Sequence, residues 1–214
     1  MHHLKVSYLI QALDLAGQAV LPERLLEAKD SLLDDKANGF LMQGYQALDG
    51  VGAAPRLKNL TFDFQLDRCL FVFDDEVHFN RYRLETLRSE LYSAFYFPWH
   101  GAYLRLCRQQ EKQCMQSGMQ QRIWYGPPLA AKCFGESEEP GDLAGNGSAG
   151  WKLNAYNDLQ YDLISRLHGY KLIRLSGYEN LMVGGSLKKV DQLLLRPDEK
   201  TLGLLANWLL RKTE

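Results

Sequence analysis

The sequence predicts an α/β fold in which helices cover a mixed central sheet. Two short neighbouring runs, 59–66 and 69–75, alternate or cluster their apolar residues as strands do. Residues 151–168 repeat apolar side chains at helical spacing, and the apolar run 170–176 follows at once. A hairpin followed by a helix and a further strand is typical of a mixed sheet with helices packed over it.

The composition is that of a globular protein. Its 214 residues are 46% hydrophobic and 24% charged, with a formal net charge of −1. This length predicts a single domain over 1–214. The near-neutral charge gives no overall basic field that would attract nucleic acid, although a local basic face could still bind phosphate. No segment has the length of a membrane span, and no secretory signal is recognisable. Four cysteines without regular spacing indicate reduced thiols, so we expect a cytoplasmic protein with no membrane partner.

The first third of the chain is predicted to be helical up to a loop. Apolar residues recur at helical intervals over 4–34, and Pro22 fits the first turn of a second helix better than a helix interior. Glycine and proline in 49–56 predict a loop. The two strands then follow, joined tightly at Asp67–Arg68, and this spacing predicts a hairpin.

Helical patterns resume after Asn80 and again over 101–116. Residues 117–150 are rich in Gly, Pro, Ser and Asn, so 95–149 is predicted to be a helical and loop insertion. Gly169 ends the helix 151–168. A last helix over 198–212 begins after Pro197 and Asp198. The core of the domain is therefore expected at 57–83 and 150–181.

Acidic residues interrupt or end the two predicted strands. Asp63 lies within TFDFQL, and Asp74 and Glu76 follow the apolar run CLFVF. If the strands pair, these three carboxylates can converge at the strand ends, where oxygen ligands suit Mg²⁺ or Mn²⁺. Such an ion can activate a water and stabilise the leaving oxygen of a phosphodiester. The alternative is a solvated strand end, since surface acids are common.

Basic residues surround these acids in the sequence. His78, Arg81 and Arg83 follow within a turn or two, and Lys152 and Arg174 lie in the second predicted core segment. Arginine binds phosphate through its forked donors. A candidate phosphate track is formed by Arg81, Arg83, Arg88, Lys152, Arg166, Lys171 and Arg174. Each of these residues taken alone is also typical of a solvated helix face.

Two blocks of the sequence resemble a known superfamily. The line FDFQLDRCLFVFDD resembles the core of the restriction-endonuclease-like superfamily with the PD-(D/E)XK motif, and is most similar to very short patch repair (Vsr-type) endonucleases. In WKLNAYNDLQYDLISRLHGYKLIRLS, a helix with polar groups precedes a Gly-aromatic pair and an apolar strand, as in that superfamily. The matching positions are Asp63-Phe64, Arg68-Cys69, 70–73, Trp151, Asp158, Asp162, Arg166, Gly169-Tyr170 and 172–175. The resemblance covers about 60–83 and 150–181, and other segments resemble a small bacterial family related to these nucleases.

The resemblance implies a restriction-endonuclease-like fold and a metal-dependent DNA endonuclease of restriction or repair type, using Mg²⁺ or Mn²⁺. Asp63 and Asp74 would hold the metal, with Glu76 as a third ligand or as a base that orients water. The lysine of the motif is absent, because Glu76 stands two residues past Asp74. Lys152 or His78 would then supply the basic group.

The resemblance also implies contacts with DNA. Arg81, Arg83 and Arg174 would position the DNA backbone, and cleavage of both strands would favour a homodimer with two sites. A helical acid upstream of the strands often completes the superfamily's site, and Glu23 and Glu27 are both candidates.

Two other functions stay open because the motif is incomplete. One is a catalytically degenerate nucleic-acid-binding or interaction module of a bacterial defence system, which keeps the fold and binds metal poorly. The other is a protein-interaction domain, in which the acids would be exposed to solvent and would lie apart from one another.

The cysteines do not favour a structural zinc site. Cys107 and Cys114 are seven residues apart, and with Cys133 and His100 they could gather an ion. This spacing is not typical of zinc sites and is long for one ion on a straight helix, so buried thiols are expected instead.

Overall fold

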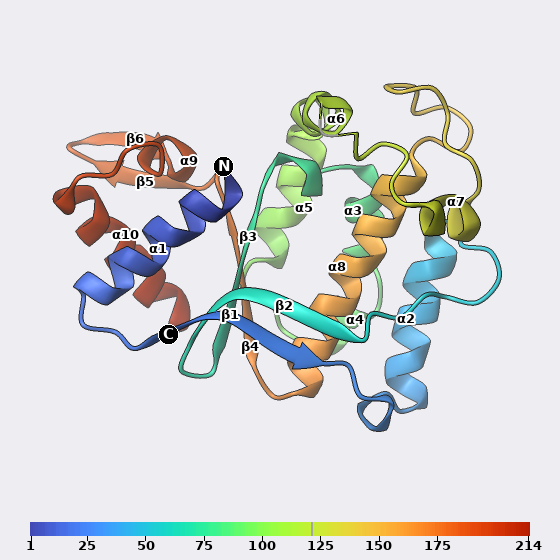
Figure 1. Ribbon diagram of the computed structural model, residues 1–214, viewed down its shortest axis with the longest axis horizontal. Helices are drawn as coiled ribbons and strands as arrows, with labels where there is room; N and C mark the ends of the chain where they lie inside the picture. The colour runs from blue at the N-terminus through green and yellow to red at the C-terminus, as the bar shows by residue number, and fades with distance from the viewer. Residues whose placement is uncertain (121) are drawn as a thin grey trace. The chain divides into compact units, whose positions relative to one another are not determined.

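The computed structural model describes residues 1–120 and 122–214, and within them the predicted α/β class is confirmed. The described chain forms two compact units. The first unit contains residues 1–26, 61–75 and 169–214, and the second contains 27–60 and 76–168. Each unit is therefore built from segments that lie far apart in the sequence (Figure 1). No helix among the described residues has the length and apolar character that crossing a membrane requires.

The elements follow the chain in this order. They are α1 (His2–Leu15), β1 (Val20–Glu27), η1 (Asp30–Leu32), α2 (Asp35–Ala47), β2 (Asn59–Leu66), β3 (Cys69–Asp74), η2 (Glu76–His78), α3 (Arg81–Thr86), α4 (Leu91–Ala94), α5 (His100–Gln109), α6 (Glu111–Gln120), α7 (Pro128–Phe134), α8 (Ala149–Leu167), β4 (Lys171–Ser176), β5 (Asn180–Val183), β6 (Ser186–Lys189), α9 (Val190–Leu193) and α10 (Glu199–Thr213).

The main sheet has the strand order β1-β2-β3-β4. β2 and β3 are antiparallel, with Leu66 opposite Cys69, and this confirms the predicted hairpin. Asp67 in its turn adopts φ 51°, in the left-handed region that Asp tolerates better than most residues. β4 runs parallel to β3, with Cys69 opposite Lys171, so the sheet is mixed as predicted.

The first unit packs its sheet against two helices. Phe64 and Phe71 face each other across the β2–β3 hairpin, with ring centroids 4.5 Å apart in a stacked arrangement. Leu9 of α1 and Leu205 of α10 are fully buried in the same apolar cluster. α1 and α10 lie side by side (Figure 1). Strands β5 and β6 form a second, two-stranded antiparallel sheet that the sequence analysis did not predict.

The second unit is organised around α8, which contacts α2, α3 and α7 (Figure 1). Because neighbours cover it on several sides, α8 buries polar as well as apolar side chains. The buried polar residues of α8 are Lys152, Asp158, Gln160, Asp162 and Ser165. A buried charge is costly unless it is paired, so the partners of these side chains decide much of the chemistry of this unit.

The helical prediction for residues 4–34 is wrong after Leu15. Residues 20–27 form strand β1 instead. β1 lies at the edge of the sheet, and an edge strand can accept Pro22 because its missing N–H need not join a ladder. Glu23 and Glu27 therefore lie on a strand and not on the expected helix.

The predicted insertion is more regular than expected. Part of the expected loop 117–150 belongs to α6 and α7, although Gln121 lies outside the described residues. The helices predicted over 151–168 and 198–212 are confirmed as α8 and α10, with Asp198 as the N-cap of α10.

Candidate functional site

Asp63 lies on β2 with its carboxylate bonded at the end of the neighbouring strand. Its Oδ2 accepts a hydrogen bond of 2.7 Å from the backbone N–H of Phe73. Its Oδ1 accepts from Nε2 of His2 at 3.0 Å, and the Asp63 side chain is 19% exposed. Because Phe73 immediately precedes Asp74, the carboxylate of Asp63 lies beside the backbone next to Asp74.

Asp74 ends β3 in a buried ion pair with Arg174 of β4. Nη1 of Arg174 donates to both carboxylate oxygens at 2.8 Å. The Asp74 and Arg174 side chains are 0% and 1% exposed. The parallel register places Arg174 opposite Val72, two positions before Asp74 and therefore on the same face of the sheet. The register of β3 and β4 thus creates the ion pair.

The hydrogen bonds that Asp63 and Asp74 accept affect how these carboxylates can bind a metal. Carboxylate oxygens have the donor chemistry that a hard cation prefers, so the residue types of Asp63 and Asp74 fit Mg²⁺ or Mn²⁺. Both carboxylates already accept hydrogen bonds from donors of the first unit, His2 and Arg174 among them. A cation must therefore compete with these donors. Glu76, the third predicted ligand, begins η2 in the second unit and is half-buried.

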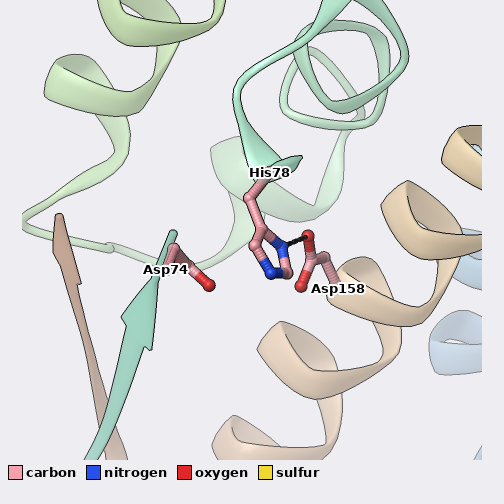
Figure 2. A group of neighbouring side chains, drawn as sticks. All are labelled: Asp74, His78 and Asp158. Atoms are coloured by element: carbon pink, nitrogen blue, oxygen red, sulfur yellow. Dashed lines mark hydrogen bonds and ion pairs between the residues drawn. The ribbon is translucent and has the colours of Figure 1, made fainter. Parts of the chain in front are cut away.

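His78 forms a hydrogen-bonded pair with an acid of α8. Its Nδ1 donates to Oδ2 of Asp158 over 2.9 Å, and the two side chains are 28% and 10% exposed. Figure 2 draws this bond as a dashed line, with His78 on η2 and Asp158 on α8. A carboxylate on Nδ1 fixes the tautomer and orientation of the imidazole, as it does for many metal-binding and proton-transferring histidines.

Arg83 belongs to a buried network that links α3, α4 and α8. Its Nη2 donates to Oδ2 of Asp162 at 2.6 Å, and its Nη1 donates to the hydroxyl of Tyr92 at 3.0 Å. The Tyr92 hydroxyl also donates to Asp162. Nε of Arg83 lies 3.7 Å from the Asp158 carboxylate, so this network adjoins the His78–Asp158 pair.

The burial of the predicted DNA-binding arginines changes their expected roles. Arg83 and Arg174 are each 1% exposed, so neither guanidinium is accessible to a DNA phosphate in this structure. Each instead compensates a buried acid. Arg81 is 48% exposed and pairs with Glu111 through a 2.6 Å bond, which raises the pKa of Arg81 above its ordinary value. Arg81 is therefore the one member of this predicted trio that is accessible to a ligand.

Lys152 is buried near the N-terminus of α8. Its ammonium donates to Oδ1 of Asn146 at 2.9 Å and to Oδ2 of Asp49 at 3.3 Å. The Lys152 side chain is 4% exposed, whereas that of Asp49 is 85% exposed. Lys152 and Arg81 both line a pocket of about 310 Å³. Lys152 is thus held in the second unit by Asn146 of the Gly-rich segment that precedes α8, and its role as the basic group of the site stays a prediction.

The residues that complete these pairs were not predicted from the sequence to have a site role. Asp158 and Asp162 are four apart on α8, beside the apolar stripe that contains Leu159 and Leu163. Acids repeated at helical spacing next to a buried stripe are the signal that could have identified them as buried. No local pattern marks Tyr92, because its role depends on the packing of α4 against α8.

The four cysteines are buried free thiols. The thiol of Cys114 donates to the carbonyl of Val77 at 3.2 Å and accepts from Asn80 at 3.4 Å. His100 donates through Nε2 to the carbonyl of Leu87 at 2.7 Å. These contacts give Cys114 and His100 structural roles.

Burial of Cys114 predicts a loss of stability in alkali. Burial raises the pKa of this thiol from 9.0 to about 12. The folded chain therefore retains a proton that the unfolded chain releases above pH 9, so the stabilisation present below pH 9 declines as the pH rises toward 12. In urea denaturation, Cys114→Ala should have a shallower decline between pH 9 and 11, by up to about 1.4 kcal/mol per pH unit.

The matched control is Met115→Leu, which alters the next residue and removes no titrating group. Its decline should parallel that of the wild type. Equal slopes for Cys114→Ala and the wild type would contradict the prediction.

Comparison with known proteins gives a family match. Residues 43–196 match the model of a family described as a family of unknown function (DUF7255). No curated protein and no solved structure matches the chain. The matched range includes the β2–β3 hairpin, α8 and β4, and with them Asp63, Asp74, Glu76, His78 and Lys152, but not β1 with Glu23 and Glu27.

Proposed function

The chain belongs to this family of unknown function, and we propose that it is a restriction-endonuclease-like protein that hydrolyses phosphodiester bonds in DNA with Mg²⁺. The observation that carries this proposal is the hydrogen bond from the backbone N–H of Phe73 to Asp63, which holds the Asp63 carboxylate beside the residue that precedes Asp74. The order of hairpin, polar helix α8, Gly169-Tyr170 and a strand parallel to β3 also agrees with the layout that the resemblance implies.

In this proposal Asp63 and Asp74 hold the cation through carboxylate oxygens. The bound ion would activate a water and stabilise the leaving oxygen. The protein contributes rigidity, since a backbone N–H orients Asp63 and a β4 side chain orients Asp74. His78, oriented by Asp158, is a side chain of the second unit with the chemistry of a general base. The predicted roles of Glu76 and Lys152 stay predictions.

A second candidate function is favoured by the Asp74–Arg174 ion pair. Arg174 places a fixed positive charge on the carboxylate that a divalent cation would use, and the lysine of the motif is missing. Repulsion from that charge weakens metal binding. The second candidate is therefore a catalytically degenerate domain that keeps the fold and binds its partner without cutting.

Substitution of Asp63 tests the first proposal. The wild-type protein should bind Mn²⁺ in calorimetry and nick plasmid DNA in Mg²⁺. Asp63→Asn should lose cleavage by at least about 100-fold and lose measurable Mn²⁺ binding, since even groups that only support a metal ligand contribute about 10–100-fold. The control is Asp67→Asn in the turn of the same hairpin, where Asn tolerates the φ of 51°.

The outcomes separate the two candidates. Binding and cleavage that are both lost in Asp63→Asn and kept in Asp67→Asn support the nuclease. Wild-type protein that binds DNA in a mobility-shift assay, yet neither binds Mn²⁺ nor cuts, supports the degenerate domain. Cleavage that persists in Asp63→Asn rules out Asp63 as the metal ligand.

A further inference from the structure

A pocket of about 520 Å³ lies in the second unit, and none of the residues that the proposed nuclease uses lines it. The segments 27–33 and 56–59 form its rim, and Leu41 of α2 and Ile164 of α8 contribute to its inner wall. Pockets for small organic ligands have volumes of roughly 300–1,000 Å³. The volume therefore accommodates a molecule of the size of a mononucleotide.

The rim of this pocket carries an excess of positive charge. Lys29, Arg56 and Lys58 line it together with two acids, Glu27 and Asp30, which leaves one net positive charge. Within the described part of the chain, no side-chain hydrogen bond or ion pair engages Lys29 or Lys58. Arg56 donates to the neutral amide oxygen of Asn38 at 2.6 Å. Because the cations outnumber the acids on the rim by one, an anion is attracted to it.

The inner wall of the pocket is apolar and is held in place. Four aliphatic side chains form it, namely Leu33, Leu41, Leu57 and Ile164. Buried Gln160 of α8 accepts a hydrogen bond of 2.9 Å from the backbone N–H of Leu57 through its Oε1. This bond attaches the segment 56–59 to α8. A flat apolar group can therefore bind a preformed surface.

We propose that this pocket binds a phosphate monoester attached to a flat organic group, such as a mononucleotide. The phosphate would contact Lys29, Lys58 and Arg56 at the rim, and the base would lie against the aliphatic wall. This inference goes beyond the proposed nuclease activity, because binding here needs neither a metal nor cleavage.

Calorimetric titration with three probes in EDTA tests the pocket. Adenosine 5′-monophosphate should bind at least about tenfold more tightly than inorganic phosphate or adenosine, because only the monophosphate uses both the rim and the wall. Lys29→Gln/Lys58→Gln should weaken its binding by about tenfold or more, since each lost cation removes a charge-assisted hydrogen bond. Lys112→Gln, which removes an exposed lysine of the same unit outside the pocket, should leave the affinity unchanged.

Two further arms identify the source of the ligand and separate this inference from the nuclease. If the phosphate belongs to a DNA end, a short single strand with a 5′-phosphate should compete with the mononucleotide, and the same strand without it should not. Asp63→Asn should bind the mononucleotide as the wild type does. No binding of the monophosphate, equal binding of inorganic phosphate, or full affinity in the double variant would overturn the proposal.

Discussion

Arg174→Met is expected to lower the free energy of unfolding by about 3–5 kcal/mol, because it removes the cation that offsets the buried carboxylate of Asp74. The two side chains are 1% and 0% exposed, and Arg174 bonds both oxygens of Asp74 at 2.8 Å. Methionine has a similar length and keeps most of the packing. Urea denaturation of the two proteins at neutral pH measures the loss.

A paired substitution is the control for this first prediction. Arg174→Met combined with Asp74→Leu should recover most of the loss, because well-packed apolar groups can replace a buried ion pair at little cost. If Arg174→Met lowers the free energy of unfolding by less than about 1 kcal/mol, the pair contributes no more than an exposed ion pair does. That result would contradict the effect expected from its burial.

The same variant reports on the proposed metal site. Without the Arg174 charge, Mn²⁺ should bind more tightly and raise the melting temperature of Arg174→Met more than that of the wild type, since a ligand of the folded state stabilises by mass action. Asp63→Asn added to Arg174→Met should abolish this metal-dependent stabilisation. If Mn²⁺ leaves the melting temperature of Arg174→Met unchanged, the two acids are not metal ligands.

Asp162→Ala is expected to lower the free energy of unfolding by a similar amount, about 3–5 kcal/mol. It removes the fully buried carboxylate that accepts from both Arg83 and Tyr92, and so leaves the Arg83 charge less compensated among α3, α4 and α8. Tyr92→Phe keeps the ion pair and loses one hydroxyl, so its expected cost is smaller, about 1–2 kcal/mol. Thermal and urea denaturation measure both losses.

An exposed ion pair near α3 is the control for Asp162→Ala. Arg88 and Glu85 lie 3.3 Å apart with side chains 52% and 47% exposed, so Arg88→Ala should cost less than about 1 kcal/mol. Equal losses in Asp162→Ala and Arg88→Ala would mean that burial does not strengthen the Arg83–Asp162 interaction.

Elements with strong local patterns were predicted correctly. The β2–β3 hairpin follows from two apolar runs that flank a two-residue turn, and α8 follows from its apolar stripe and Gly169. Residues 20–27 were predicted wrongly because their leucines fit a helical spacing as well as a strand. Pairing with β2 makes this segment a strand, and that pairing depends on residues more than 30 positions away.

The candidate site, like the fold, was predicted from the sequence only in part. The sequence pattern was enough to predict that Asp63 and Asp74 lie on or at the end of paired strands, and it left His78 and Lys152 as alternative basic groups whose roles stay predictions. The residues that pair with the buried charges could not be predicted from the sequence pattern. Asp74 pairs with a residue 100 positions away and Arg83 with one 79 positions away, so both pairs arise from the register of parallel strands and the packing of α8. Long-range packing therefore decides whether an acid or a base of this chain faces a ligand or another buried charge. Burial of a charge makes a compensating charge necessary, and the local sequence does not specify which residue supplies it.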